Sequence, residues 1–225
     1  MGHAGMAAVA VRYLRSVGTP TVAGAVEALP RPELRAVGED ERAPVDPAEF
    51  RRVLGHFATG VTVVTTPAAS PAAEGGDGNG GRDRDRDGDP AGPAGPAGFA
   101  CQSFASLSLD PPLICFMVAR TSTTWPRIAR AGVFCVNVLG AHQGDLCRGF
   151  AVSGADKFAG VEYDAAPVSG SPRLAGAAAW IDCAVHAVHT GGDHLIVVGR
   201  VDALGTGGDG DGVPPLLFHK GRFLT

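Results

Sequence analysis

The spacing of apolar residues predicts a helix and then a strand at the start of the patterned part of the chain. Between residues 46 and 59 apolar side chains recur three and four residues apart, as on one face of a helix. These side chains are Phe50, Val53, Leu54 and Phe57. Asp46 can cap this helix and Gly60 would end it. The β-branched run at 61–66 predicts a strand directly afterwards.

From residue 98 onwards the pattern predicts mostly short strands. Ser122 can cap a helix that Gly132 would end, and Gly191-Gly192-Asp193 has the composition of a hairpin turn. Before that turn, the odd-numbered residues from Ala179 to Ala187 are expected on one side of a strand. The predicted strands cover 112–119, 133–139, 177–189, 194–204 and 216–223, and the predicted helices cover 122–130 and 143–151.

This order of elements favours a mainly β fold. Short antiparallel strands with few helices are typical of a barrel and not of a doubly wound sheet. No glycine fingerprint opens a helix after a strand, so a nicotinamide cofactor would have to bind in some way other than on a Rossmann fold.

Two segments fall outside the patterned domain. Residues 1–45 show no periodicity long enough for a domain and are predicted to be a flexible N-terminal extension to a domain at 46–225. Residues 67–97 are rich in Gly, Pro, Ala and Asp and are predicted to be a disordered, low-complexity loop. Fragments of this loop resemble a dinucleotide fingerprint and a calcium loop, but both lack essential parts of those motifs.

Charge and composition narrow the range of functions that the protein could have. The net charge of -4 and the pI of about 5.9 lack the basic footprint of a nucleic-acid binder. No run of 18 apolar residues is present, so no membrane span is expected. The five cysteines have no metal-ligand spacing, so we interpret them as reduced, mostly buried residues of a cytoplasmic protein without a bound metal.

Three polar clusters interrupt the apolar pattern. Residues 98–112 combine small residues, hydroxyls and one amide, which suits either a flat heteroaromatic ligand or an ordinary strand edge. Residues 121–126 place three hydroxyls at a helix start, either as an anion site or as a plain cap. Asn137 lies inside an apolar strand, where backbone groups or a ligand could satisfy its amide.

Together with Asp156-Lys157-Phe158 and Gly192-Asp193-His194, these clusters resemble one family. The chain is similar to the short flavin reductases, the small components of two-component flavin monooxygenases, over about residues 46–223. The matching motifs include 57–66, Ser103-Phe104, 106–113, Val136-Asn137-Val138-Leu139 and Pro215-Leu216-Leu217. The forms at 100–104 and 134–139 look closest to actinobacterial members that serve sterol-ring, aromatic and natural-product oxygenases.

The resemblance implies a split β-barrel (a Greek-key, FMN-binding barrel) that forms a homodimer with the flavin near the interface. It places the isoalloxazine ring against the first cluster, the ribityl-phosphate against hydroxyls, and the nicotinamide near His194, as the catalytic residue, with Phe158 nearby. The implied cofactor-binding residues are Ala100, Cys101, Gln102, Ser103, Ser108, Met117, Val118, Ala119, Ser122, Thr123, Thr124, Phe150, Phe158 and His194. Gln102 stands where the family commonly has Asn.

The implied function is NAD(P)H:flavin oxidoreductase activity. Hydride transfer from NADH or NADPH would reduce free FMN or FAD, and the reduced flavin would pass to a separate flavin-dependent monooxygenase. Two alternatives remain at this point. The same barrel could be an oxidase with tightly bound flavin, or a non-enzymatic flavin- or haem-binding protein.

Overall fold

The computed structural model describes residues 45–69, 95–152, 154, 156–207 and 212–224. The predicted N-terminal extension and most of the predicted 67–97 loop lie outside these residues, so both stay predictions. Within the described part, β3 already begins at Ala97, one residue inside the range given to the loop.

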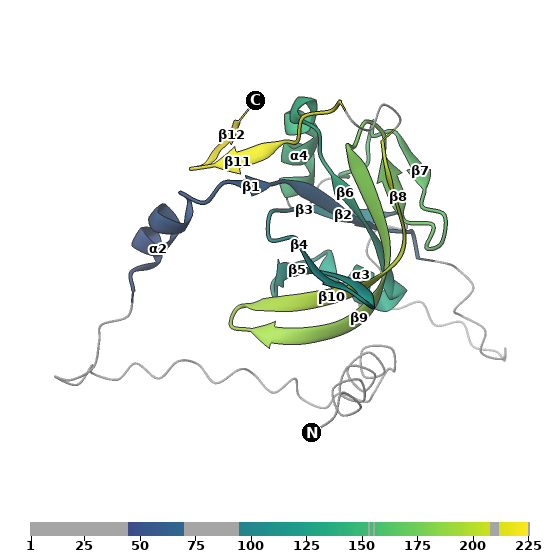
Figure 1. The fold of residues 1–225 in the computed structure, drawn as a ribbon, viewed down its shortest axis with the longest axis horizontal. Helices are drawn as coiled ribbons and strands as arrows, with labels where there is room; N and C mark the ends of the chain where they lie inside the picture. Colours follow the sequence, from purple (N-terminus) through teal and green to yellow (C-terminus); the bar gives the residue numbers. More distant parts are fainter. Residues whose placement is uncertain (1–44, 70–94, 153, 155, 208–211, 225) are drawn as a thin grey trace, which may run out of the picture.

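The core of the fold is one antiparallel sheet of seven strands in the order β3-β2-β6-β9-β10-β5-β4 (Figure 1). β3 and β4, its two edge strands, follow each other in the chain with three residues between them. The sheet therefore curls until its two edges approach each other. The strands are β2 (Thr62–Thr66), β3 (Ala97–Cys101), β4 (Ala105–Leu109), β5 (Pro112–Ala119), β6 (Val133–Val138), β9 (Ala179–Gly191) and β10 (His194–Thr206).

Hydrogen bonds made by side chains, rather than a ladder of backbone hydrogen bonds, bridge the gap between β3 and β5. The Ser103 hydroxyl donates to the Met117 carbonyl at 3.0 Å and accepts from the Met117 amide at 3.1 Å. The Cys101 thiol is 3.8 Å from the same carbonyl. The barrel thus stays split here, and the polar cluster of the sequence lies at the split.

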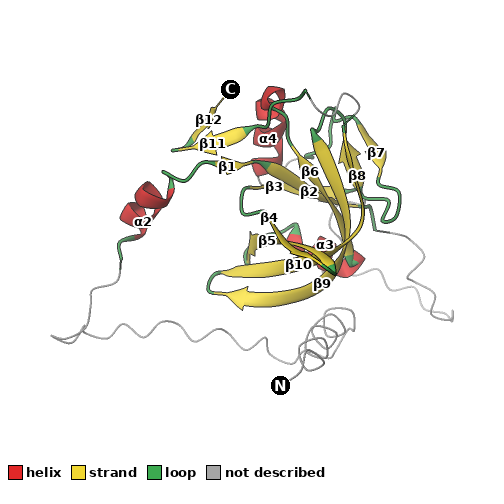
Figure 2. Cartoon of the chain, in the orientation of Figure 1, coloured by secondary structure: helices red, strands yellow, loops and turns green. Residues whose placement is uncertain are grey.

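In the described part of the chain, three α-helices accompany the curled sheet (Figure 2). α3 (Trp125–Ala131) contributes buried Trp125 and Ile128 to the main core, next to Phe116 and Phe134. α4 (Gly144–Ala151), preceded by the 3-10 turn η2 (Ala141–Gln143), packs Phe150 into a second cluster beside β2 and β3. α2 (Pro47–Leu54) has no buried residue.

The first predicted helix needs a correction. It ends at Leu54, with Gly55 as its C-cap, and Gly60 belongs to the two-residue strand β1 (Thr59–Gly60). Its apolar face does not join the core, because Phe50 is 54% exposed and Phe57 78% exposed. The sequence pattern showed an amphipathic helix correctly but could not show whether this chain alone covers it.

The last predicted strand is in fact a hairpin. β11 (Leu217–His219) and β12 (Arg222–Leu224) pair antiparallel and join β1 in a small separate sheet. The turn between them needs left-handed backbone at Lys220 (φ 48°) and Gly221 (φ 81°). A further two-stranded sheet, β7 (Tyr163–Ala165) with β8 (Pro172–Leu174), lies where no strand was predicted.

Buried polar side chains hold the sheet to the β7–β8 segment. The fully buried Asn137 amide donates to the carbonyls of Val63 and Pro172, each at 3.2 Å, and accepts from the Leu174 amide at 2.8 Å. Backbone groups therefore satisfy Asn137, and the ligand alternative for it is wrong. Asp182 is also fully buried, with Oδ2 accepting from the amides of Val168 and Ser169.

Candidate functional site

A pocket of about 490 Å³ lies at the split of the barrel. This volume is in the range of small-molecule sites. Its walls come from the end of β3, the end of β5, the segment before α3 and the end of α4. The lining residues are Phe99, Ala100, Cys101, Gln102, Ser103, Met117, Val118, Ala119, Thr121, Ser122, Thr123, Thr124, Phe150, Ala151, Lys157 and His194.

This one pocket gathers most of the residues that the sequence singled out from five separate segments. Only Ser108 and Phe158 of the predicted cofactor-binding set do not line it. Ser108 lies on β4 beyond the split. Phe158 lies outside the pocket, behind the lining residue Phe150, and packs edge-on against its ring, with 5.1 Å between the ring centres.

The hydroxyl-rich segment precedes α3, which begins at Trp125, later than predicted. The N-cap is Thr124 and not Ser122, and no side chain caps the helix. The Ser122 hydroxyl instead accepts from the amides of Thr124 and Trp125 at 3.3 and 3.2 Å, in the turn before the helix. Thr124 is buried, and its hydroxyl is 3.5 Å from the carbonyl of Gly98 on β3, while Thr121 and Thr123 are exposed on the rim of the pocket.

Lys157 is a pocket residue that the predicted cofactor-binding set missed. Its ammonium donates to the carbonyls of Phe150 at 3.0 Å and Gly98 at 3.2 Å, so it ties the end of α4 to β3. Burial lowers the pKa of this ammonium below its ordinary value. The feature of the sequence that could have drawn attention to Lys157 is the rarity of lysine, because the chain has only two, Lys157 and Lys220.

Close packing at Gly98 makes this arrangement possible. A Cβ atom at this position would lie 2.9 Å from Cε1 of Phe150 and 3.1 Å from the carbonyl oxygen of Val64. Only glycine lets β3 approach α4 this closely. The same approach brings the two carbonyls that hold Lys157 within reach of one ammonium.

His194 stands at the start of β10, directly after the β9–β10 turn, and is paired in register with Ala119 of β5. Its Nδ1 is 2.7 Å from Oδ1 of Asp193. The imidazole beside it holds the pKa of the Asp193 carboxyl below its usual range. This contact fixes the orientation of the ring at the rim of the pocket.

The cysteines behave as small apolar residues. All five are free thiols, four of them buried, as the sequence indicated. Burial raises the pKa of Cys101, the thiol that lines the pocket, and raises that of Cys135 to about 12. Within the described residues, no group of three or more His, Cys, Asp or Glu side chains could hold a metal ion.

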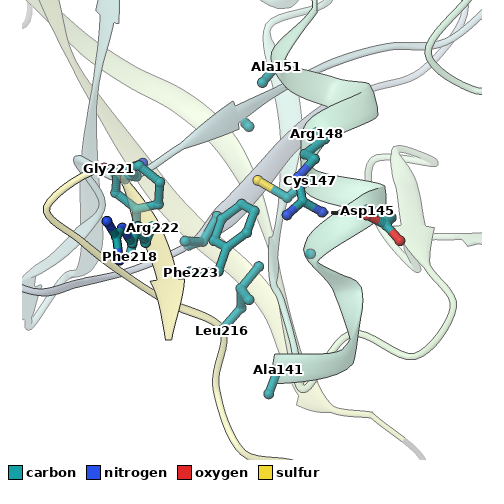
Figure 3. Close-up of a pocket in the computed structure, with 14 residues that line it drawn as sticks. Ala141, Asp145, Cys147, Arg148, Ala151, Leu216, Phe218, Gly221, Arg222 and Phe223 are labelled. Atoms are coloured by element: carbon teal, nitrogen blue, oxygen red, sulfur yellow. Dashed lines mark hydrogen bonds and ion pairs between the residues drawn. The ribbon is translucent and has the colours of Figure 1, made fainter. Parts of the chain in front are cut away.

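A second hollow of about 740 Å³ adjoins the pocket and shares Ala100, Gln102 and Ala151 with it. Figure 3 shows Phe223 of the C-terminal hairpin facing α4 across this hollow. The Arg148 guanidinium lies 5.1 Å from the centre of the Phe223 ring and forms an ion pair with Asp145. Gln102 therefore stands between two cavities.

The model of the flavin reductase like domain matches residues 54–225. The reductase subunit HsaB of a flavin-dependent monooxygenase from Rhodococcus jostii (strain RHA1) is 43% identical over 179 residues, covering 80% of this chain and 77% of that protein. The solved structure of nitrilotriacetate monooxygenase component B from Mycobacterium thermoresistibile has a TM-score of 0.64 at 42% identity, over 79% of this chain and 84% of that one.

A second solved structure was determined with ligands. The NADH:FAD oxidoreductase SgcE6 of Streptomyces globisporus, in complex with NAD and FAD fragments, has a TM-score of 0.65 at 33% identity. The match covers 82% of this chain and 96% of that one. The similarity extends over the whole curled sheet and the pocket, which confirms the split-barrel fold. The chain therefore belongs to the flavin reductase family, whose members are oxidoreductases that reduce flavin and supply it to monooxygenases.

Proposed function

We propose that this flavin reductase binds free flavin in the pocket at the barrel split and reduces it with NADH. The observation that carries the proposal is the composition of that pocket. Flat apolar walls from Phe99, Met117 and Phe150 suit a ring system, and the hydroxyls before α3 together with Lys157 suit a phosphate. When bound, the two cofactors supply the redox chemistry, in which a hydride passes from the nicotinamide to the flavin.

The chain's own contribution is alignment. The amide of Gln102 and the hydroxyl of Ser103 lie at the end of β3, where they could hydrogen-bond the polar edge of the isoalloxazine ring. Ser103 is already fixed by its two bonds to Met117, so it would offer a positioned oxygen without further ordering.

We assign His194 to the nicotinamide. It lines the pocket at the end of the β5–β10 pair, beside Ala119, and its ring bonds to Asp193. Replacement by alanine should raise the KM for NADH roughly tenfold, as expected for the loss of one good polar contact. The KM for flavin should change less than twofold, and initial rates over a matrix of NADH and flavin concentrations measure both.

A matched control for this variant is His189→Ala. His189 is exposed on the same hairpin but does not line the pocket, so both KM values should stay as in the wild type. An unchanged KM for NADH in His194→Ala, or an equal rise in both variants, would remove His194 from the nicotinamide site.

Transfer of reduced flavin to a separate monooxygenase requires release. Micromolar dissociation constants correspond to about -8 kcal/mol, and a much tighter site would retain its product. The rim of the pocket is consistent with release, since Gln102, Ser103, Met117 and His194 are all exposed. The free thiols are consistent with a cytoplasmic location, which we include in the proposal.

We further propose that the working form is a homodimer. α2 places Phe50, Val53 and Leu54 on a face that nothing in the described chain covers, and this helix stands away from the barrel (Figure 1). A groove of about 470 Å³ runs from α2 to Gln102 and Ser103. A second copy seated in this groove would cover the apolar helix face and close one side of the flavin pocket.

The deciding assay mixes the full chain with NADH and excess free FMN or FAD and follows absorbance at the nicotinamide band. We expect oxidation of NADH at a rate that rises with added flavin, and the preferred flavin follows from the comparison. A yellow protein that keeps its flavin through gel filtration would instead indicate the oxidase alternative. Failure to oxidise NADH or NADPH with either flavin would leave the non-enzymatic binding alternative.

A further inference from the structure

Lys157 carries a positive charge that the described residues do not compensate. Its Nζ has no carboxylate within ion-pair distance among them, and its described partners are two backbone carbonyls. An ammonium group has three N–H donors, so these two bonds leave one donor for another acceptor. The side chain is half-buried and lines the pocket. A partly desolvated cation with a spare donor favours an anion in that pocket.

The carbonyl of Gly98 shows where that anion would lie. It accepts from Lys157 Nζ at 3.2 Å and is 3.5 Å from the Thr124 hydroxyl, so the ammonium and the hydroxyl-rich segment meet at one atom. Thr121, Ser122 and Thr123 line the same pocket. The ammonium and these hydroxyls come from segments far apart in the chain, and all of them line this one cavity.

We propose that Lys157 is the cationic ligand of the flavin phosphate, with the hydroxyls of Thr121, Ser122 and Thr123 as its neutral partners. This assignment rests on the proposed binding of flavin in this pocket. The phosphate it recognises is the one attached to the ribityl chain, which FMN and FAD share and riboflavin lacks. The two carbonyl bonds hold the ammonium in place, so little side-chain entropy remains to be lost on binding.

The test compares FMN with riboflavin, because these ligands differ only by the phosphate. Dissociation constants are measured by quenching of flavin fluorescence for the wild type, Lys157→Met and Lys157→Arg. In the wild type FMN should bind more tightly than riboflavin. The ratio of the two constants should fall about tenfold or more in Lys157→Met, as for loss of a charge-assisted hydrogen bond. Lys157→Arg should keep most of the ratio.

Arg130→Met is the matched control. It removes one positive charge from an exposed position on α3 that does not line the pocket, and the ratio should stay as in the wild type. An unchanged ratio in Lys157→Met would overturn the proposal. So would an equal loss of affinity for both flavins, because that result would show a purely structural role in joining β3 to α4.

A measurement on the wild type keeps the proposal testable if Lys157→Met does not fold. Reductive methylation of lysines, read by mass spectrometry, should be slowed at Lys157 by saturating FMN but not by saturating riboflavin. Equal protection by both ligands, or by neither, would contradict the assignment. A wild type that binds neither flavin would refute the proposed function itself. Flavin binding that does not depend on Lys157 would refute only the assignment of Lys157 to the phosphate.

Discussion

Replacing Asn137 by leucine should lower the free energy of unfolding by about 3 kcal/mol, because it leaves the buried Leu174 amide without its acceptor and removes the hydrogen bonds that the side-chain amide donates. The side chain is fully buried and bonds to Val63, Thr65, Pro172 and Leu174. Leucine has a similar volume and cannot hydrogen-bond, so packing changes little while the bonds are lost. The melting temperature should fall by roughly 6–12 °C, measured by calorimetry or circular dichroism.

Thr62→Val is the control for this variant. It removes a single buried hydrogen bond, from the Thr62 hydroxyl to the carbonyl of Cys101 at 2.9 Å, and should cost about 1 kcal/mol. Since Asn137 does not line the pocket proposed to bind flavin, the folded fraction of Asn137→Leu should keep its affinity for flavin at low temperature. A loss of stability no larger than that of Thr62→Val would show that water replaces the amide and that our account of its role is wrong.

If the proposed homodimer forms through the groove beside α2, the double variant Phe50→Glu/Phe57→Glu should convert it to a monomer. Both side chains line the groove beside Gln102 and Ser103 and are more than half exposed in one copy of the chain. Burying two such side chains stabilises an interface by about 3 kcal/mol or more, which is roughly a hundredfold or more in the dissociation constant. Light scattering after gel filtration should show half the wild-type mass, and flavin reductase activity should fall because the pocket is then open on one side.

Val168→Glu provides the comparison. Val168 is also exposed and apolar, but it lies in the turn between β7 and β8, away from the groove, so mass and activity should stay as in the wild type. A wild type that is monomeric at micromolar concentration would refute the dimer. A double variant that stays dimeric would place the interface on another surface, and the exposed edge strand β4, with Leu109 95% exposed, would be the next to examine.

The strands that were predicted well are those whose local pattern and burial agree. β5 has the bounds given to it from its apolar run, and the turn at Gly192 follows from a glycine that adopts positive φ. The C-terminal hairpin was missed because the segment from Leu216 to Phe223, with apolar residues at both ends, was interpreted as one strand and Lys220-Gly221 was not recognised as a turn. The burial of Asp182 does not follow from strand alternation, because it depends on the turn at Val168 and Ser169, which donates two amides to this carboxylate.

Most residues of the candidate site could be predicted from the sequence only because they lie in recognisable motifs. The polar clusters at 100–103 and 121–124 attract attention as exceptions in an apolar pattern, and the structure brings them to one pocket. Lys157 lies in the motif Asp156-Lys157-Phe158, but the motif alone does not show what the lysine contacts. Its importance depends on a contact with Gly98, 59 residues earlier in the chain, and sequence spacing contains no information about such a contact.

The close approach at Gly98 also limits how the enzyme could be re-engineered for other cofactors. A designer who wished to reshape the pocket for a bulkier or smaller flavin analogue could not work from this wall of β3, since any side chain at position 98 would meet Phe150 and the Val64 carbonyl at once. Trimming the ring at position 150 would make room, but it would remove part of the wall that faces the ligand. Cofactor scope is therefore easier to alter from the Gln102 side, where the pocket opens into the neighbouring hollow.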